Sequence, residues 1–504
     1  MTNALPARKD SRVRETILSP VAPQGFPGQT NLIDFGFDGF PDPLRAAPGL
    51  ELLKSAAFFI DAANAKTGDA YAFNQGTGGF ALDARYGSSL TIGAADTNDP
   101  LLLPWTGTNY LYCPGVTGNG ASSPDSAALD IVGDIEMVCR VALDDWSPAA
   151  GQTFMAKRDG SASYLFRTPA ASPGKIEIAW WTAAIPTVAQ STISLPATDG
   201  VCYWLKATLD VDNGATGKDT RFYYAADQAT EPTVWTQLGA TVTTAGTTSI
   251  DVGTSPLYIG IGNANISEPA SGKFYRAIVR DGIGGTTVFD ANFTTGITTG
   301  AQVTFTESSS NAATVTINRS TAGRKCVAVT RPVWLFGTDD YMEVADNALL
   351  NMDASQSFTV VAVVRQWTTA VASGRYLAKG AAGTANAYAL LGNATSATLR
   401  IDDMAAATAS GVSSTAAAGT ARVYSGVRDM TTRRVTTYAN TVAGTAGVDA
   451  TVEQFTNTFP MRIGADGGAS VVSFQDFELV AVAVFRRALT ATEIATINTY
   501  YGTA

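Results

Sequence analysis

Acid–base chemistry in this sequence has to rely on groups other than histidine, because the chain contains none. Histidine is the usual general base, proton shuttle and transition-metal ligand near neutral pH. Its absence excludes Ser-His-Asp and Cys-His catalytic arrangements. The closest set of carboxylates is Asp130, Asp134 and Glu136, and Glu136 lies in a predicted strand between the apolar Ile135 and Met137.

The four cysteines, Cys113, Cys139, Cys202 and Cys326, are widely scattered and form no Cys-x-x-Cys pair. This spacing indicates neither a zinc site nor a thioredoxin-like motif. Low cysteine usage in a long chain is typical of assembly in a reducing cytosol. We therefore predict buried free thiols, with a disulfide between Cys113 and Cys139 as the open alternative.

Residues 175–181, Lys-Ile-Glu-Ile-Ala-Trp-Trp, have the composition of a strand. Strand alternation places Trp180 with the two isoleucines on one face, and Glu177 with Trp181 on the other. Sugars stack on exposed aromatic rings and need a few fixed polar groups. We predict a glycan-binding site at Trp181 and Glu177; the alternative is that Trp181 packs under a loop or against a neighbouring subunit.

The composition predicts a folded β-rich protein. Hydrophobic residues make up 45% of the 504 residues and charged residues 15%, and the 48 glycines are typical of short strands joined by many turns. The net charge of −10 argues against nucleic acid as a partner, because phosphate binding needs clustered Lys and Arg. The N-terminal residues lack the apolar segment of a secretory signal, and no apolar stretch is long enough for membrane insertion.

Changes in composition along the chain predict five segments. Seven of the 21 prolines lie in the first 50 residues and disfavour helix and central strand there, so we expect an extended arm that is either a solvated tail or an anchor ordered on assembly. The expected segments are an arm (1–50), a mixed connecting segment (51–100), a first β-sandwich (101–295), a linker β-hairpin (296–325) and a second β-sandwich (326–504).

A divergent internal repeat supports the two sandwiches. Similar stretches follow one another in the same order twice: 105–112 and 335–344, 134–141 and 357–364, 154–157 and 376–379, 257–260 and 461–464, 273–279 and 476–482. The first of these matches places Asn109 where the second copy has Asp340. The spacing between copies shortens along the chain, so the first copy should carry the longer loops.

Two local elements complete the expected fold. Residues 303–306 and 314–317 alternate apolar residues with Thr around a polar turn, which predicts the linker hairpin. Thr490 and Glu493 form a capping box, with Leu489 and Ile494 as a hydrophobic staple, so a short C-terminal helix should start there and end before Gly502.

Three stretches resemble a known family. Residues 336–344, 357–365 and 474–494 are similar to the opening, second-strand and closing motifs of laminin-G-like, concanavalin A-like modules. The resemblance implies an all-β protein with two tandem concanavalin A-like (LamG-type jelly-roll) antiparallel β-sandwiches. Acidic residues near a structural calcium are common in that family, which implies Asp339, Asp340 and Asp466 as calcium ligands; an ordinary turn is the alternative.

Enzymes of this fold that cleave glucans carry a Glu-x-Asp-x-x-Glu strand, which puts the acid and the nucleophile on one face. No Glu of this chain is followed two positions later by Asp, and the Asp134-Ile-Glu136 stretch has the reverse order. We therefore expect that the protein is not an enzyme.

Residues 98–115 and 272–282 resemble stretches of minor tail proteins of tailed phages, particularly those of actinobacteria. The resemblance implies a virion structural protein of the tail, assembled in the host cytoplasm without a signal peptide. Its expected partners are other tail proteins, bound through the N-terminal arm, further copies in a symmetric trimer or ring, and a host surface glycan. The alternatives are a capsid decoration protein, or a stand-alone glycan-binding protein or glycoside hydrolase.

Overall fold

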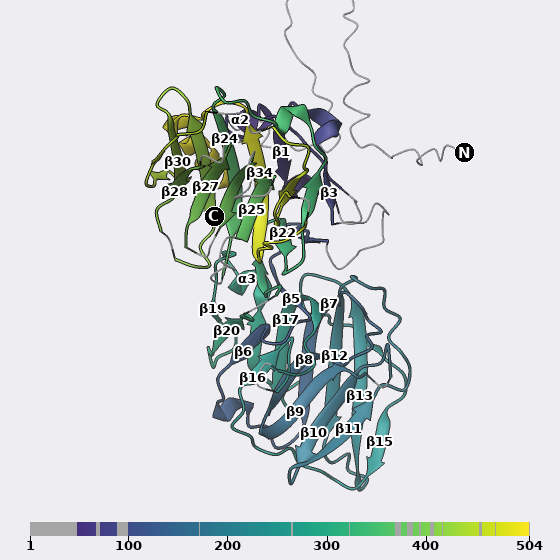
Figure 1. Cartoon of the computed structure of the whole chain (residues 1–504). Coiled ribbons are helices and arrows are strands. Elements are labelled where there is room, and N and C mark those ends of the chain that lie inside the picture. The colour runs from purple at the N-terminus through teal and green to yellow at the C-terminus, as the bar shows by residue number, and fades with distance from the viewer. Residues whose placement is uncertain are drawn as a thin grey trace, which may run out of the picture. The chain divides into compact units, whose positions relative to one another are not determined.

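The computed structural model describes residues 48–66, 71–87, 99–170, 172–263, 266–321, 323–367, 374–380, 387–392, 395–403, 408–415, 417–452, 456–468 and 470–502. The predicted arm lies outside this part of the chain, except for residues 48–50. The described residues form two antiparallel β-sandwiches, each with a nine-stranded and an eight-stranded sheet (Figure 1). The all-β class and the two tandem sandwiches are therefore confirmed.

The nine-stranded sheet of the first sandwich has the order β14-β13-β12-β7-β17-β5-β21, with β15 on β13 and β18 on β17. Its strands are β5 (Tyr110–Pro114), β7 (Ile135–Leu143), β12 (Tyr203–Asp210), β13 (Gly217–Ala226), β14 (Thr236–Gln237), β15 (Val242–Ala245), β17 (Ser271–Asp281), β18 (Thr286–Asn292) and β21 (Val327–Val329). The eight-stranded sheet, β11-β10-β9-β8-β16-β6-β20-β19, packs against it. Its strands are β6 (Gly120–Ser123), β8 (Gln152–Asp159), β9 (Ser161–Thr168), β10 (Glu177–Thr182), β11 (Ile185–Gln190), β16 (Leu257–Ile259), β19 (Thr304–Thr306) and β20 (Thr314–Asn318).

The second sandwich repeats this arrangement. Its nine-stranded sheet has the order β31-β30-β29-β24-β34-β22-β4, with β32 on β30 and β1 on β34. These strands are β1 (Phe58–Asp61), β4 (Leu101–Leu103), β22 (Val333–Phe336), β24 (Phe358–Arg365), β29 (Arg422–Asp429), β30 (Arg434–Ala439), β31 (Val442–Ala443), β32 (Gly447–Val448) and β34 (Phe477–Phe485). The eight-stranded sheet, β2-β3-β23-β33-β25-β26-β27-β28, comprises β2 (Tyr71–Ala72), β3 (Ala84–Tyr86), β23 (Met342–Val344), β25 (Gly374–Lys379), β26 (Ala387–Gly392), β27 (Ala397–Asp402), β28 (Thr408–Val412) and β33 (Met461–Ile463).

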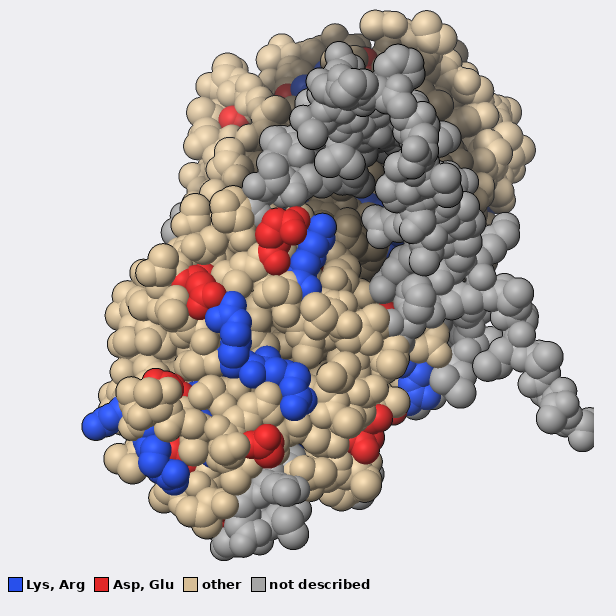
Figure 2. All heavy atoms as spheres, turned by 90° about the horizontal axis from the view of Figure 1, so that it is seen from above, with Lys and Arg blue, Asp and Glu red and all other residues tan. Residues whose placement is uncertain are grey.

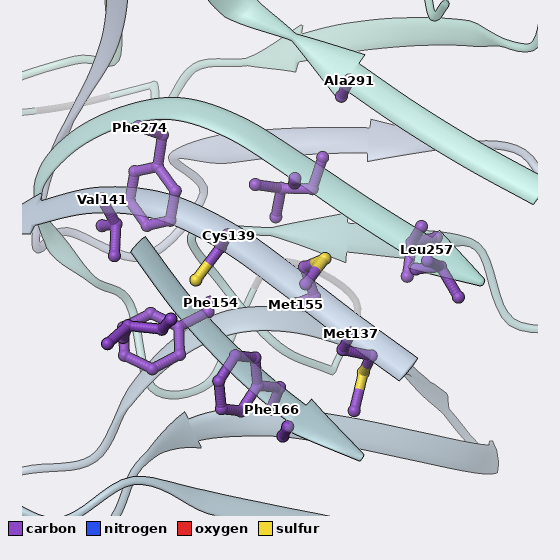
Figure 3. Packing of buried hydrophobic residues seen from close by; sticks show 14 of the residues in the cluster. Met137, Cys139, Val141, Phe154, Met155, Phe166, Leu257, Phe274 and Ala291 are labelled. Atoms are coloured by element: carbon purple, nitrogen blue, oxygen red, sulfur yellow. The ribbon is translucent and has the colours of Figure 1, made fainter. Parts of the chain in front are cut away.

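The core of each sandwich follows from strand alternation. Met137, Cys139 and Val141 of β7 point into the first core, where they meet aromatic side chains of the facing sheet (Figure 3). Phe154 and Phe166 pack edge to face there, with ring centroids 5.0 Å apart. Such pairs add stabilisation beyond the area that they bury.

Helices are few and short. They are α2 (Pro48–Lys54), α3 (Phe293–Gly296), α4 (Ala491–Tyr501) and the 3-10 turns η1 (Ala62–Asn64), η2 (Gly79–Leu82), η3 (Ala127–Leu129) and η4 (Ala348–Leu350). The predicted C-terminal helix is α4, with the capping box between Thr490 and Glu493 formed on both sides and Gly502 at its end. Helices α2 and α4 cover the outer face of β24 and β34, where Val361 and Val363 are buried.

The internal repeat extends to single side chains. Lys157 in the second half of β8 and Lys379 at the end of β25 are both fully buried. The Nζ of Lys157 donates to Asp125 Oδ1 at 2.6 Å and to the carbonyl of Gly253; the Nζ of Lys379 donates to Asp346 Oδ1 at 2.8 Å and to the carbonyl of Phe459 at 2.6 Å.

Two tyrosines also match. Tyr164 on β9 and Tyr388 on β26 donate to the carbonyls of Leu129 and Leu350, the last residues of η3 and η4. Burying a hydroxyl or an ammonium is unfavourable without such partners. In both sandwiches, therefore, a buried lysine and a buried tyrosine find equivalent hydrogen-bond partners.

One predicted match of the repeat is wrong. Strand order makes β5 the equivalent of β22 and β6 the equivalent of β23, because β5 pairs with β17 as β22 pairs with β34. The residue in the position of Asp340, just before β23, is therefore Asn119, just before β6, and not Asn109. Asn119 is buried, and its Oδ1 accepts from the backbone N–H of Cys326 at 2.7 Å.

The strand pairing also corrects the predicted boundaries. Strands β1, β3 and β4 lie in the segment expected only to connect, yet they pair with β34, β23 and β22 of the second sandwich (Figure 1). The hairpin β19–β20 forms as predicted, but β20 pairs with β6, and β21 pairs with β5. The expected linker thus belongs to the first sandwich. The first sandwich spans residues 110–329, and the second combines residues 48–103 with 333–501.

The two added segments occupy equivalent places. Strands β18–β21 complete the first sandwich as β1–β4 complete the second: β18 and β1 pair with the long strands β17 and β34, and β21 and β4 form the far edge of each nine-stranded sheet. The first sandwich is thus completed by the chain that follows it. The second is completed by the chain that precedes the first.

Deleting residues 1–103 is expected to unfold the second sandwich while the first stays folded. The deletion removes Phe58, Phe59, Ile60 and Leu82, all fully buried. Burial of each such side chain stabilises a protein by about 1.5–3 kcal/mol, and whole domains are stable by only about 5–15 kcal/mol. Limited proteolysis with mass spectrometry measures the effect, with deletion of residues 1–46 as the control. A protease-resistant fragment of residues 333–501 in the longer deletion would contradict this expectation.

Candidate functional site

The outer face of the eight-stranded sheet in the first sandwich carries the predicted aromatic site. On β10, Ile178 and Trp180 are buried in the core, whereas Trp181 points to the outer face and is half-buried. Strand alternation therefore gives the orientation that the sequence predicted. The adjacent turn at Ala183 and Ala184 has φ angles of 51° and 61°, which bring β11 back alongside β10.

The indole of Trp181 lies on a small apolar platform. It packs against Ala156, Leu165 and Ala179 of β8, β9 and β10. The guanidinium carbon of Arg158 lies 5.5 Å from the centroid of the ring, which is within the range of a cation–π contact. The ring is thus held in one orientation.

An exposed apolar strip continues from Trp181 onto the edge strand. Pro186 of β11 lies directly opposite Trp181, and Val188 lies opposite Ala179. Val188, on the same face as Trp181, is 49% exposed. A half-exposed ring beside such a strip offers a flat face for a ligand with apolar and polar sides.

Glu177 is on the same face as Trp181 but is not open to a ligand. Its side chain is 2% exposed. Its Oε1 lies 2.5 Å from an Nη2 of Arg167 on β9, and its Oε2 accepts from the side-chain amide of Gln190 on β11 at 2.7 Å. Arg167 also pairs with Glu268. Glu177 therefore acts as the centre of a polar network that joins three strands.

The second sandwich lacks an aromatic residue at this place. Trp180 lies opposite Tyr164, and Ile401 lies opposite the equivalent Tyr388, so Asp402 occupies the position of Trp181. Asp402 is 3% exposed and pairs with Arg400. The sandwich fold therefore does not require a tryptophan here.

The residues predicted to bind calcium are partly held by arginines. Asp340 is fully buried, and its two carboxylate oxygens accept from Nε and Nη2 of Arg324 at 2.9 and 2.8 Å. Asp466 is buried, and its Oδ2 lies 3.4 Å from Nη2 of Arg375. Asp339, beside Asp340, is half-buried.

A structural calcium at Asp339, Asp340 and Asp466 stays a prediction. The structure brings the two loops together, because the carbonyl oxygen of Asp340 lies next to Gly464. In the described ranges of the chain, no group of three or more Asp, Glu or Cys side chains is arranged to hold a metal ion. Two of the three predicted carboxylates have arginine as counter-ion instead.

The carboxylates nearest to a glucanase motif have separate structural partners. Asp130 lies 3.2 Å from Lys157 Nζ, Asp134 accepts from the backbone N–H of Val211 at 2.8 Å, and Glu136 pairs with Arg280. Glu136 is also buried on the outer face of β7. Each group thus neutralises or caps a different part of the fold.

Some residues of the site were not predicted from the sequence. Arg158, Arg167 and Gln190 come from three strands other than β10, so only the strand register reveals them. Alternation alone gives no signal for them, because the same face of β8, β9 and β11 also carries Ala156, Leu165 and Val188, so the strand pairing has to be known.

A family model matches most of the second sandwich. Residues 336–495 match the family model described as the concanavalin A-like lectin/glucanases superfamily. Together with the pairing of the strands, this defines the chain as a protein that carries a concanavalin A-like, laminin-G-like domain, within two sandwiches of the same topology. A search of curated protein sequences found no match.

Among solved structures, domains LG4-5 of the mouse laminin α1 chain align with 79% of this chain and 96% of their own, at 13% identity and a TM-score of 0.27. A putative carbohydrate binding protein of Bacteroides ovatus aligns over 45% of this chain and 62% of its own, at 13% identity and a TM-score of 0.31. The binding domain of Paraclostridial Mosquitocidal Protein 1 aligns over 36% of this chain and 46% of its own, at 12% identity and a TM-score of 0.29. The chain thus spans about half the length of this last structure.

We expect Asp340 to give the stability of the protein a distinct pH dependence. Burial raises the pKa of Asp340 to about 6, although Arg324 opposes this shift. An unfolded aspartate has a pKa of about 3.9. Between these values the folded state binds the proton more tightly, so this contribution to the free energy of unfolding is present below about pH 4 and lost as the pH rises to about 6.

Urea unfolding of the wild type and of Asp340→Asn between pH 4 and 7 measures this contribution. The free energy of unfolding of the wild type relative to the variant should fall across the window by up to about 3 kcal/mol, because one pKa unit corresponds to about 1.4 kcal/mol. A constant difference between the two proteins over the whole range would show that Asp340 does not titrate there.

Proposed function

We propose that this protein is a structural component of a phage tail and that its first sandwich presents a lectin-like face to a host surface glycan. Trp181 is the observation that carries the adhesion part of the proposal. It is an oriented, half-exposed ring at a position where the second sandwich has Asp402. Because the fold does not need this ring, a role in binding accounts for it.

The tail assignment is supported by the similarity of residues 98–115 and 272–282 to minor tail proteins. The first stretch runs from β4 of the second sandwich to β5 of the first, and the second stretch contains most of β17. The two similar stretches therefore contain the passage from the second sandwich to the first and most of the long strand β17, with which β18 pairs.

The proposed protein binds without catalysis. Asp130, Asp134 and Glu136 are held by Lys157, Val211 and Arg280, so none of these groups is placed to act as a paired acid and nucleophile. The described part of the chain contains no helix long and apolar enough to cross a membrane. On the face drawn in Figure 2, the described Lys and Arg lie among Asp and Glu, and most of the described surface carries neither.

We further propose that residues 1–50 anchor the protein to other tail proteins and that copies assemble in the host cytoplasm as a symmetric trimer or ring. Mass spectrometry of purified virions should detect peptides of this chain, and gold-labelled antibodies against the first sandwich should mark the tail in electron micrographs. Label on the head alone would make it a capsid decoration protein. Its absence from virions would contradict the proposal.

Trp181→Ala is expected to weaken glycan binding at least about tenfold, which corresponds to about 1.4 kcal/mol. Binding of the full chain to a glycan array identifies the ligand, and titration with that glycan measures the change. Trp235→Ala is the matched control, because Trp235 is also half-buried beside a cation, Lys206 Nζ at 4.4 Å from its ring, but lies outside the face that carries Trp181. Equal affinities of Trp181→Ala and the wild type would refute the site.

A further inference from the structure

Two of the four cysteines meet in the first sandwich. The Sγ atoms of Cys113 and Cys326 are 3.3 Å apart, although 213 residues separate them in the sequence. Both side chains are fully buried. Cys113 belongs to β5, and Cys326 immediately precedes β21.

The register places the two cysteines directly opposite each other. Strands β5 and β21 are antiparallel, with Val327 opposite Tyr112 and Ala328 opposite Leu111. One further step puts Cys326 opposite Cys113. The backbone N–H of Cys326 donates to Asn119 Oδ1 at 2.7 Å and not to β5, which marks a pair without mutual backbone hydrogen bonds.

Opposite residues of this kind have Cα atoms about 4.5 Å apart, with their side chains close together. Disulfides bridge Cα separations of about 4.4–6.8 Å. The backbone of β5 and β21 therefore already has a geometry that a disulfide can span. Only a rotation of the two side chains is required.

We propose that Cys113 and Cys326 form a redox-dependent disulfide that locks β21, and with it the closing segment β18–β21, onto the first sandwich. The oxidant is a low-molecular-weight disulfide such as oxidised glutathione. One cysteine thiolate attacks it and releases one glutathione, and the second thiolate then attacks the mixed disulfide and releases the other. The two cysteine thiols lose two protons and two electrons, and the oxidant is reduced to two thiols.

An oxidant can reach the two thiols only through the edge of the sheet at β21. Burial raises the pKa of the Cys113 thiol well above its usual value, so the closed sandwich holds it protonated and unreactive. Strand β21 is a short edge strand with β5 as its only neighbour in the sheet order. Val327, Ala328 and Val329 of β21 are themselves buried, so the thiols react only when this edge opens locally, and one such opening exposes both of them.

The remaining cysteines are arranged differently. Cys139 points into the core near Phe154 and Phe166 (Figure 3) and lies opposite Leu205 and Ala277. Cys202 is only half-buried and precedes β12. The disulfide between Cys113 and Cys139 that the sequence left open is not the favoured pair, because Cys113 lies opposite Gly272 on its other side.

The disulfide would form after assembly and then hold β21 on the first sandwich. In a reducing cytosol both thiols persist, and β21 is not cross-linked. In an oxidising medium the cross-link closes a large loop, which stabilises the folded state by restricting the unfolded chain. This inference does not depend on the proposed glycan site.

The full chain, purified under reducing conditions, is incubated with oxidised glutathione, alkylated in denaturant and digested for mass spectrometry. We expect a peptide pair linked through Cys113 and Cys326, with the chain lighter by two hydrogen atoms, and a higher melting temperature than the reduced protein. Cys139→Ser and Cys202→Ser should retain both effects. Cys113→Ala and Cys326→Ala should lose both.

Because an alanine variant of a buried cysteine can fail to fold, the linked peptide in the wild type is the primary readout. A second incubation in mild urea, below the unfolding transition, should speed the reaction if edge opening limits it. Alkylated Cys113 and Cys326 after both incubations would overturn the proposal. A linked peptide containing Cys139 or Cys202 in place of either would overturn it as well.

Discussion

The long strands β17 and β34 need partners along both edges, and most of the structure depends on how this need is met. Each pairs with a central strand, β7 or β24, on one side. On the other side each pairs with β5 or β22 and with β18 or β1, which an added segment of chain supplies. An unpaired edge at the centre of a sheet leaves backbone donors and acceptors buried without partners. Segments 286–329 and 58–103 supply β18 and β1, so they are integral to the sandwiches.

This requirement connects the two sandwiches more tightly than a linker would. The chain passes from the second sandwich to the first between β4 and β5, and returns between β21 and β22. Each passage is short, because only a few residues separate β4 from β5 and β21 from β22. The sandwich that closes last in folding must wait for contacts that are distant in sequence, which is a slow step in β proteins.

The sequence allowed the elements to be predicted better than their partners. The internal repeat identified β7 and β24, alternation identified the inward face of β10, and the capping box identified α4, because none of these features requires the strand pairing to be known. The pairing of Phe58 with Val484 could not be predicted in this way, since no local pattern states which edge a strand will cover. The match of Asn109 with Asp340 was wrong for a related reason. Both residues follow a Gly-Thr turn, so the two turns look equivalent in the sequence. The pairing of β5 and β6 shows that Asn119 is the equivalent residue. At the candidate site, alternation gave the direction of Glu177, but its burial is set by Arg167 and Gln190 from neighbouring strands.

Two sandwiches with one topology allow function to be separated from fold within a single chain. Features present in both, such as the buried Lys157 and Lys379 and the tyrosines that bond to η3 and η4, serve the fold, because both copies keep them. Features present in one copy are not required by the shared topology. Trp181, where the other copy has a buried Asp402, and the cysteine pair beside β21 belong to this second kind. Both lie on the first sandwich, one on an outer face and one at a closing edge, so the first sandwich is where binding and regulation should be sought.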